Sequence, residues 1–537
     1  MTETVLLTGG RVHSPAAPDA TAMAVSAGTV VWVGQDGPGR ALHPDAEEIP
    51  LDGAFVAPAF VDAHVHATAA GLHLTGLDLT GVRDARELLY EVRARASTMH
   101  RGEILLAHGW DDTTWTKLPS RAELDEAADA FPVYLSRVDV HSALVSSGLI
   151  ELAPEATTAA GWSADGPVSG AAHHLLRGAV RAEIAPEQRT HAQRTFLAAA
   201  AAAGIASVHE CAGPDISSES DLTDLLELAS RPEVPEVVAY WGELISPDDP
   251  GTVDLAKGLG VRGLAGDLFV DGALGSRTAA LGSPYADDPT SRGNRYLDAD
   301  AIAGHIVACT NAGLQAGFHV IGDAAVAEVI EGYRRAEELV GCRAIAGGKH
   351  RLEHVEMVDA DQAAALARWN VAASVQPAFD ALWGGERGMY ATRLGRERAL
   401  GLNPLRMLAA HGVLLACGSD APVTPLDPWG GVRAAALHRT PGAGLSARAA
   451  FNAHTRGGHR AAGVTDGVSG TLVPGAPAHY AVWEAGELVV AAADSRVQRW
   501  STDPRSRVPP LPSLEPEATL PRCLRTVRAG VTIFEAE

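Results

Sequence analysis

The middle of the chain alternates short apolar runs with longer segments rich in Ala, Leu and Glu. Runs of four to eight apolar residues are typical of buried strands, whereas helices need longer periodic segments. We predict eight strands, at residues 55–66, 204–210, 234–242, 261–272, 314–323, 350–358, 371–379 and 413–422. Eight strands with helices between several of them predict an α/β fold of the (β/α)8 TIM-barrel type.

Two further regions lie outside this alternation. The first two predicted strands are separated by about 140 residues, far more than a βα loop contains. We therefore predict an inserted α+β subdomain at residues 75–190, after strand one, which caps the active site. Short β-like runs punctuated by Gly occur near both ends of the chain. They predict a small composite β-sandwich from residues 1–57 and 468–537, which leaves 58–74 and 191–467 for the barrel.

The composition of the chain narrows the possible classes of binding partner and the expected cellular compartment. Lys and Arg number 43 against 66 Asp and Glu, a formal charge of −23, which disfavours nucleic acid or an anionic membrane as partner. The five cysteines are scattered and include no C-x-x-C pair, which is typical of a reducing cytoplasm. We see no signal peptide and no apolar run long enough to span a membrane. A cytoplasmic protein acting on a small molecule is therefore expected.

Ligand-type side chains gather at the predicted ends of the strands. The first apolar run ends on His64 and His66, and residues two apart on a strand point the same way, so one strand could grip a metal ion. In a barrel, the carboxyl ends of the strands carry the active site. The other candidates there are Asp267, Asp271, His319, His354 and Asp420. This set suits Zn²⁺ or a similar divalent metal.

Each of these residues has a simpler structural interpretation. A single His319 or His354 is often a hydrogen-bonded structural histidine. Asp420, after Gly-Ser, is typical of a turn or a helix cap, and Asp271 before Gly272 of a turn. The ordered set on strands one, five, six and eight favours a metal site over these separate explanations.

The motifs along the chain resemble the amidohydrolase superfamily, most closely its amidohydrolase-3 branch, which includes N-substituted formamide deformylases. The segments that carry the resemblance are PAFVDAHVH, GWDDTTW, DVHSALVSS, GIASVHE, DGALGSRTAAL, FHVIGD, RLEHVE, SVQPAF, GSDAPVTPLDPW and GTLVPGAPA. They cover nearly the whole chain. The resemblance implies a metal-dependent hydrolase that acts on C–N bonds other than peptide bonds. A homodimer is common in that family.

The resemblance also implies a ligand set, with one departure. The residues that match metal-site positions are His64, His66, His319, His354 and Asp420. The branch usually has Lys where this chain has Asp267, and that lysine can be carboxylated to bridge two metals. Either Asp267 binds metal directly, or one ion lies on His64, His66, His319 and Asp420. We favour the single ion, with His354 either supporting a ligand from behind or facing the substrate.

Three functions remain open at this point. The first is hydrolysis of an amide or an N-acyl or N-formyl amine by water activated at the metal, with Asp420 moving the proton and His354 stabilising charge on oxygen. The second is deamination of an amino-heterocycle. The third is a non-catalytic barrel scaffold that has lost the bridging lysine.

Three residues are expected to touch the substrate. Arg277 could bind a substrate carboxylate, or form a structural ion pair. His141 and Trp110 could line the pocket from the insertion, or be structural residues of that subdomain.

Overall fold

The computed structural model describes residues 4–129, 131–138, 142–245, 251–490 and 508–537. The chain divides into two compact units, one formed by Met1–His66 and Leu197–Glu537 and the other by Ala67–Phe196. The boundaries given above for three domains remain a prediction.

The first unit contains an eight-stranded parallel sheet in which neighbouring strands follow one another along the chain. Its strands are β7 (Phe60–Val65), β13 (Ile205–Ala212), β14 (Glu236–Trp241), β15 (Gly263–Leu264), β16 (Gln315–Val320), β17 (Arg351–His354), β18 (Ala372–Val375) and β19 (Leu414–Cys417). Each strand overlaps one of the eight predicted segments, so the predicted (β/α)8 barrel is confirmed. Strands such as β13 and β16 are buried along their whole length, as expected for parallel strands that are covered on both faces.

β15 is much shorter than its predicted segment, residues 261–272. Gly266 has a φ of +85°, and a side chain at this position would come within 3.0 Å of Cβ of Cys211. The backbone therefore leaves the strand at this close approach. A single parallel bridge between Phe269 and His319 resumes the contact with β16, so Asp267 lies beyond the end of β15.

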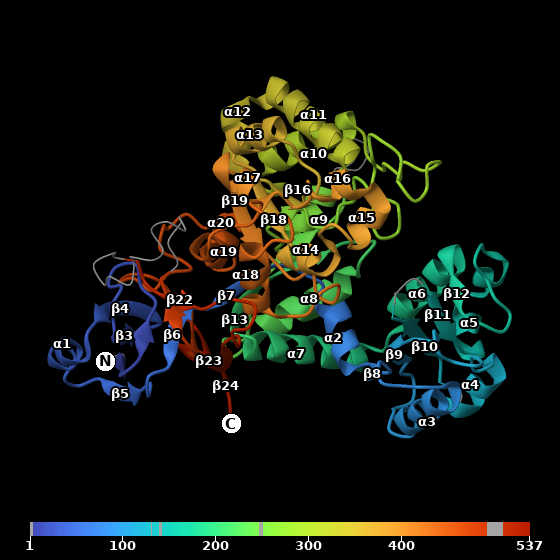
Figure 1. Cartoon of the computed structure of the whole chain (residues 1–537), viewed down its shortest axis with the longest axis horizontal. Coiled ribbons are helices and arrows are strands. Elements are labelled where there is room, and N and C mark those ends of the chain that lie inside the picture. The colour runs from blue at the N-terminus through green and yellow to red at the C-terminus, as the bar shows by residue number, and fades with distance from the viewer. Residues whose placement is uncertain (1–3, 130, 139–141, 246–250, 491–507) are drawn as a thin grey trace. The chain divides into compact units, whose positions relative to one another are not determined.

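Helices accompany the barrel strands (Figure 1). They are α8 (Glu219–Ala229), α9 (Gly251–Leu259), α10 (Ala299–Ala312), α11 (Asp323–Val340), α12 (Cys342–Gly348), α13 (Ala360–Arg368), α14 (Pro377–Trp383), α15 (Met389–Leu394), α16 (Arg396–Ala399), α17 (Leu405–Ala410), α18 (Pro428–Ala436), α19 (Ala447–Ala453) and α20 (Arg456–Ala461). α10 shows why such helices start and stop: Asp298 caps its first turn, and Gly313 ends it at a φ of +72°. Within the described residues, no helix combines the length and apolarity needed to cross a membrane.

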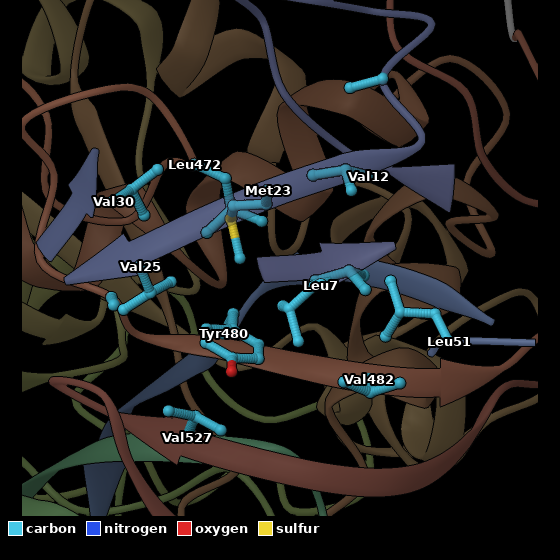
Figure 2. Packing of buried hydrophobic residues seen from close by; sticks show 13 residues of the cluster. Leu7, Val12, Met23, Val25, Val30, Leu51, Leu472, Tyr480, Val482 and Val527 are labelled. Carbon is cyan, nitrogen blue, oxygen red and sulfur yellow. The ribbon is translucent and has the colours of Figure 1, made fainter. Parts of the chain in front are cut away.

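Both ends of the chain contribute to the same β-structure. One sheet has the order β4-β3-β1-β5 and a second the order β2-β6-β20-β23-β24, while β21 pairs with β22. The elements are β1 (Thr4–Thr8), β2 (Arg11–Val12), β3 (Ala22–Ser26), β4 (Thr29–Gly34), α1 (Asp36–Leu42), β5 (Glu47–Pro50), β6 (Phe55–Pro58), β20 (Tyr480–Glu484), β21 (Leu488–Val489), β22 (Leu511–Pro512), β23 (Arg522–Arg528) and β24 (Val531–Glu535). Figure 2 shows Leu7, Met23 and Val25 packed with Tyr480 and Val482, so residues from both ends of the chain fill one core.

The second unit has its own sheet, of order β12-β11-β10-β9-β8. Its elements are α2 (Ala67–Thr75), β8 (Leu77–Asp78), α3 (Ala85–Ala96), β9 (Leu105–Trp110), α4 (Arg121–Ala127), β10 (Val133–Arg137), β11 (Ser142–Val145), α5 (Ser147–Leu152), a 3-10 turn (Pro154–Thr158), β12 (Val168–Ser169) and α6 (Gly170–Glu183). α7 (Pro186–Ala202) runs from this unit into the first. The sheet mixes parallel and antiparallel pairs.

Candidate metal centre

Four histidines predicted as ligands converge at the carboxyl ends of the barrel strands. His64 lies in β7 and His66 directly follows it, while His319 lies in β16 and His354 ends β17. The ring centroids of His64 and His66 are 5.2 Å apart. His354 lies 5.1 Å from His64 and 4.5 Å from His319. Residues nearly 300 positions apart in the chain thus meet at one point.

The Asp267 carboxylate lies among all four imidazoles. Its Oδ1 is 3.4 Å from Nε2 of His64 and 3.5 Å from Nδ1 of His319. The same oxygen is 3.8 Å from Nε2 of His354, and Oδ2 is 3.2 Å from Nε2 of His66. The amidohydrolase-3 branch usually has a lysine at this position, which gains a carboxylate only when it is carboxylated. Asp267 already has a carboxylate.

Asp420 joins the cluster from the loop after β19. Its Oδ1 is 3.2 Å from Nε2 of His66 and 3.7 Å from Nε2 of His64. Two backbone hydrogen bonds tie this loop to the first barrel strand: the Asp420 N–H donates to the His64 carbonyl at 2.8 Å, and the His66 N–H donates to the Ala421 carbonyl at 2.9 Å. The seam that closes the barrel therefore sets the distance between Asp420 and the two histidines.

Asp62 strengthens this seam from the β7 side. Its Oδ1 accepts a hydrogen bond from the Ser419 N–H at 2.8 Å. Burial raises the pKa of Asp62 to about 6, although the hydrogen bonds from Ser419 act in the opposite direction. Gly418 makes the close approach possible, because a Cβ there would lie 2.5 Å from the backbone nitrogen of His64.

Two of the clustered residues have backbone conformations that side chains rarely adopt. His354 has a φ of +69° and Asp420 a φ of +57°. A non-glycine residue in the left-handed region costs on the order of 1–3 kcal/mol and is concentrated at functional sites. The surrounding structure therefore holds these two side chains in place at the expense of local stability.

In this cluster, neighbouring groups of opposite charge favour the ionised forms of both the carboxylate and the imidazoles. Burial raises the pKa of Asp267, but the four imidazoles outweigh burial and hold that pKa well below its usual range. Burial lowers the pKa of His66, but Asp267 and Asp420 outweigh burial and hold it well above its usual value. The pKa of His354 is raised to about 9 by the same two carboxylates, against the effect of burial.

Several ligand atoms are buried without a partner. Within the described residues, the atoms of this cluster that form no hydrogen bond of normal geometry include His64 Nε2, Asp267 Oδ1, His319 Nδ1, His354 Nε2 and Asp420 Oδ1. Buried polar atoms are almost always hydrogen-bonded. Imidazole nitrogens and carboxylate oxygens are the donor types that bind divalent metals, so this cluster is a candidate metal site.

Two residues behind the imidazoles were missed by the sequence analysis. Nδ1–H of His64 donates to Oε2 of Glu353 at 2.8 Å, and Nδ1–H of His354 donates to Oε1 of Gln376 at 2.7 Å. Both partners lie in quoted motifs, RLEHVE and SVQPAF. The available signal was a glutamate in a strand buried on both faces, because a buried charge must be paired.

The remaining barrel residues have structural contacts. Asp271 is fully buried and accepts the backbone N–H groups of Ala280, Ile321 and Gly322, so it organises the loops after β15 and β16. Arg277 forms a two-pronged ion pair with Asp287, at 3.1 and 2.8 Å. Binding of a substrate carboxylate by Arg277 remains a prediction, and it would compete with this pair.

Of the two candidates from the insertion, the structure describes Trp110. Trp110 lies in β9, with its side chain fully buried in the core of the second unit. Its Nε1–H donates to the carbonyl of Leu135 at 2.8 Å. This placement fits the structural alternative, and a role in the pocket remains a prediction. His141 lies outside the described residues.

Comparison with known proteins gives matches along most of the chain. A curated relative, Protein LONG AFTER FAR-RED 3 of Arabidopsis thaliana, is 28% identical over 471 residues, which are 81% of this chain and 78% of the relative. The N-substituted formamide deformylase of Arthrobacter pascens is 23% identical over 438 residues, 76% of this chain and 78% of that protein.

A solved structure and a family model extend these matches. The crystal structure of an uncharacterized metal-dependent hydrolase from Pyrococcus furiosus is 27% identical, with a TM-score of 0.75. The alignment covers 89% of this chain and 98% of that one. The model of the Amidohydrolase family matches residues 47–534. Because this match spans far more than half of the sequence, the chain belongs to the Amidohydrolase family and is a hydrolase.

Proposed function

We propose that this protein is a metal-dependent hydrolase of C–N bonds other than peptide bonds, acting on a small amide or an N-acyl or N-formyl amine. The observation that carries the proposal is the convergence of four imidazoles and two carboxylates at the carboxyl ends of the barrel strands, where barrels of this type have their active sites. The relatives named as a deformylase and as a metal-dependent hydrolase support it.

The residues present fit a divalent metal such as Zn²⁺. Two groups of residues each bring their buried ligand atoms within 4.8 Å of one another. These groups are His64–His66–Asp267 and Asp267–His319–His354. Asp267 belongs to both, so we propose that it would hold metal directly and that the cluster would take two ions. The sequence alone favoured a single ion. With one ion, Nε2 of His354 would remain free to stabilise a developing oxyanion; with two, it would be a ligand.

Asp420 is proposed as the residue that moves the proton. A bound divalent metal would make water acidic near neutral pH and polarise a carbonyl. Asp420 Oδ1 faces the same centre without a hydrogen bond of normal geometry. A carboxylate in this position can accept a proton from the attacking water and deliver it to the departing nitrogen, which otherwise leaves poorly.

The cluster argues against a non-catalytic scaffold. A scaffold has no physical need for buried ligand atoms without partners, since each costs free energy. The missing lysine was the best support for a non-catalytic scaffold. The position of Asp267 weakens that support, because its carboxylate contacts all four imidazoles.

Product analysis tests the proposal. The metal-loaded protein is incubated with N-formyl and N-acyl amines, and separately with aminopurines and aminopyrimidines. We expect amine release from the first set, and its loss in Asp420→Asn with the fold retained. Ammonia release from the second set alone would replace the proposal with a deaminase, and a wild-type protein that binds no divalent metal would contradict both. A homodimer and a cytoplasmic location remain predictions.

A further inference from the structure

Beneath the candidate ligands, the barrel interior holds a charged pair that no proposed catalytic step uses. Arg351 and Glu353 lie two residues apart on β17, so their side chains share one face of the strand. Both are fully buried. Nε of Arg351 donates to Oε1 of Glu353 at 2.6 Å, and Nη2 donates to Oε2 at 2.9 Å. This is a two-pronged pair in the middle of the protein.

The rest of the Arg351 guanidinium is also fixed. Nη2 donates to the carbonyl of Ala63 in β7 at 2.7 Å, and Nη1 donates to Nδ1 of His209 in β13 at 3.0 Å. The guanidinium carbon lies 4.4 Å from the centre of the Tyr240 ring in β14. Contacts from three other strands therefore hold the arginine, and through it the carboxylate of Glu353, in one position.

Glu353 in turn fixes the position of the His64 ring. Its Oε2 accepts the Nδ1–H of His64 at 2.8 Å. That hydrogen bond leaves the lone pair on Nε2, which faces Asp267 at 3.4 Å and Asp420 at 3.7 Å. Sγ of Cys211 lies 3.5 Å from the same nitrogen, Nδ1.

The other imidazoles have weaker support. His354 donates to the neutral amide oxygen of Gln376, and His319 contacts the carbonyl of Gly272 at 3.3 Å. Of the four candidate ligands, His64 is the one with a carboxylate behind it in the described part of the chain. A carboxylate behind a ligating imidazole raises its basicity and fixes its tautomer.

We propose that Glu353, clamped by Arg351, is a positioning residue that makes His64 the strongest imidazole ligand of the metal centre. The proposal rests on the proposed function, because it assumes that the centre binds metal. Stability alone is a poor explanation for the pair, since a buried ion pair is often no more stable than apolar residues of similar volume.

Glu353→Gln is the first test. The amide keeps the shape and an accepting oxygen, but removes the charge, so the support of His64 becomes like that of His354. Metal affinity is measured by chelator competition with Zn²⁺, and the ligand field by the visible spectrum of the Co²⁺-loaded protein. We expect binding 10–100-fold weaker and an altered Co²⁺ spectrum. Unchanged affinity and an unchanged spectrum would overturn the proposal.

The double variant Arg351→Met/Glu353→Leu separates positioning from stability, and also serves if the single variant does not fold. It removes both charges together, so no charge is left buried alone. We expect a folded protein, judged by urea denaturation, whose metal affinity stays as weak as in Glu353→Gln. Wild-type affinity in this variant would show that the pair is only structural.

A matched control removes a carboxylate from an ion pair on the outside of the barrel. Glu337 on α11 pairs with Arg368 on α13, so Glu337→Gln should leave metal affinity and the Co²⁺ spectrum unchanged. A loss of affinity equal to that of Glu353→Gln would overturn the assignment to Glu353. Failure of the wild-type protein to bind metal would overturn the proposed function and this inference together, whereas normal wild-type binding with no effect at Glu353 overturns this inference alone.

Discussion

Gly418 offers a direct test of the seam that closes the barrel. Its φ is not in the left-handed region, so alanine fits the backbone and only space is at issue. A Cβ there would lie 2.5 Å from the backbone nitrogen of His64 and 2.8 Å from Oδ1 of Asp62. Such short contacts do not persist, so in Gly418→Ala the loop after β19 must move away from β7.

The structure sets the size of the effect. The movement weakens the hydrogen bonds from Ser419 to Asp62 and from Asp420 to the His64 carbonyl, both 2.8 Å long. Each is worth about 1 kcal/mol, and overpacking of a tight interior costs about 1–3 kcal/mol more. We expect the free energy of unfolding to fall by about 3–5 kcal/mol. Metal affinity should fall as well, because Asp420 moves away from His64.

Urea denaturation of the metal-free protein measures the first effect, and chelator competition the second. Gly304→Ala, within α10, is the matched control, because a Cβ there meets nothing within 4 Å. Alanine should stabilise that helix by up to about 1 kcal/mol. A Gly418→Ala protein that loses less than about 1 kcal/mol and keeps wild-type metal affinity would refute the account of the seam.

Three further predictions concern the cluster. In Asp420→Asn, kcat should fall by about 10²-fold or more while the fold stays intact; unchanged turnover would remove Asp420 from the mechanism. In Asp267→Ala, elemental analysis should show less metal per chain, and an unchanged content would mean that Asp267 is not a ligand. In the metal-free protein the pKa of His354 is raised from 6.5 to about 9, a contribution of about 3 kcal/mol to stability. That contribution is fully present below pH 6.5 and is lost as the pH rises through about 9, so His354→Asn should flatten the pH dependence seen in urea denaturation.

The sequence predicted best those strands whose character depends on their own burial. Strands of a parallel barrel are buried on both faces, so β18 (AASV) and β19 (LLAC) can be recognised as short, mostly apolar runs. The length of β15 could not be predicted in this way, because its end depends on the approach of Gly266 to Cys211 in another strand.

The candidate site also combines features that the sequence predicts with features that it does not. The positions of His64 and Asp420 at strand ends follow from the pattern and from the resemblance. The contact of Glu353 with His64 does not, because it joins residues 289 positions apart across the barrel, and strand register cannot be read from the residues alone. The place of Asp267 among the imidazoles likewise depends on distances that only the fold fixes.

The pairing of β6 with β20 has a consequence for how the chain is made. β6 lies immediately before the first barrel strand, yet its partner comes more than 400 residues later, and β23 lies on the far side of β20. A ribosome-bound chain therefore displays an unpaired strand edge and half of an apolar core until its last segments emerge. Shielding of that edge by a chaperone would matter most during this interval.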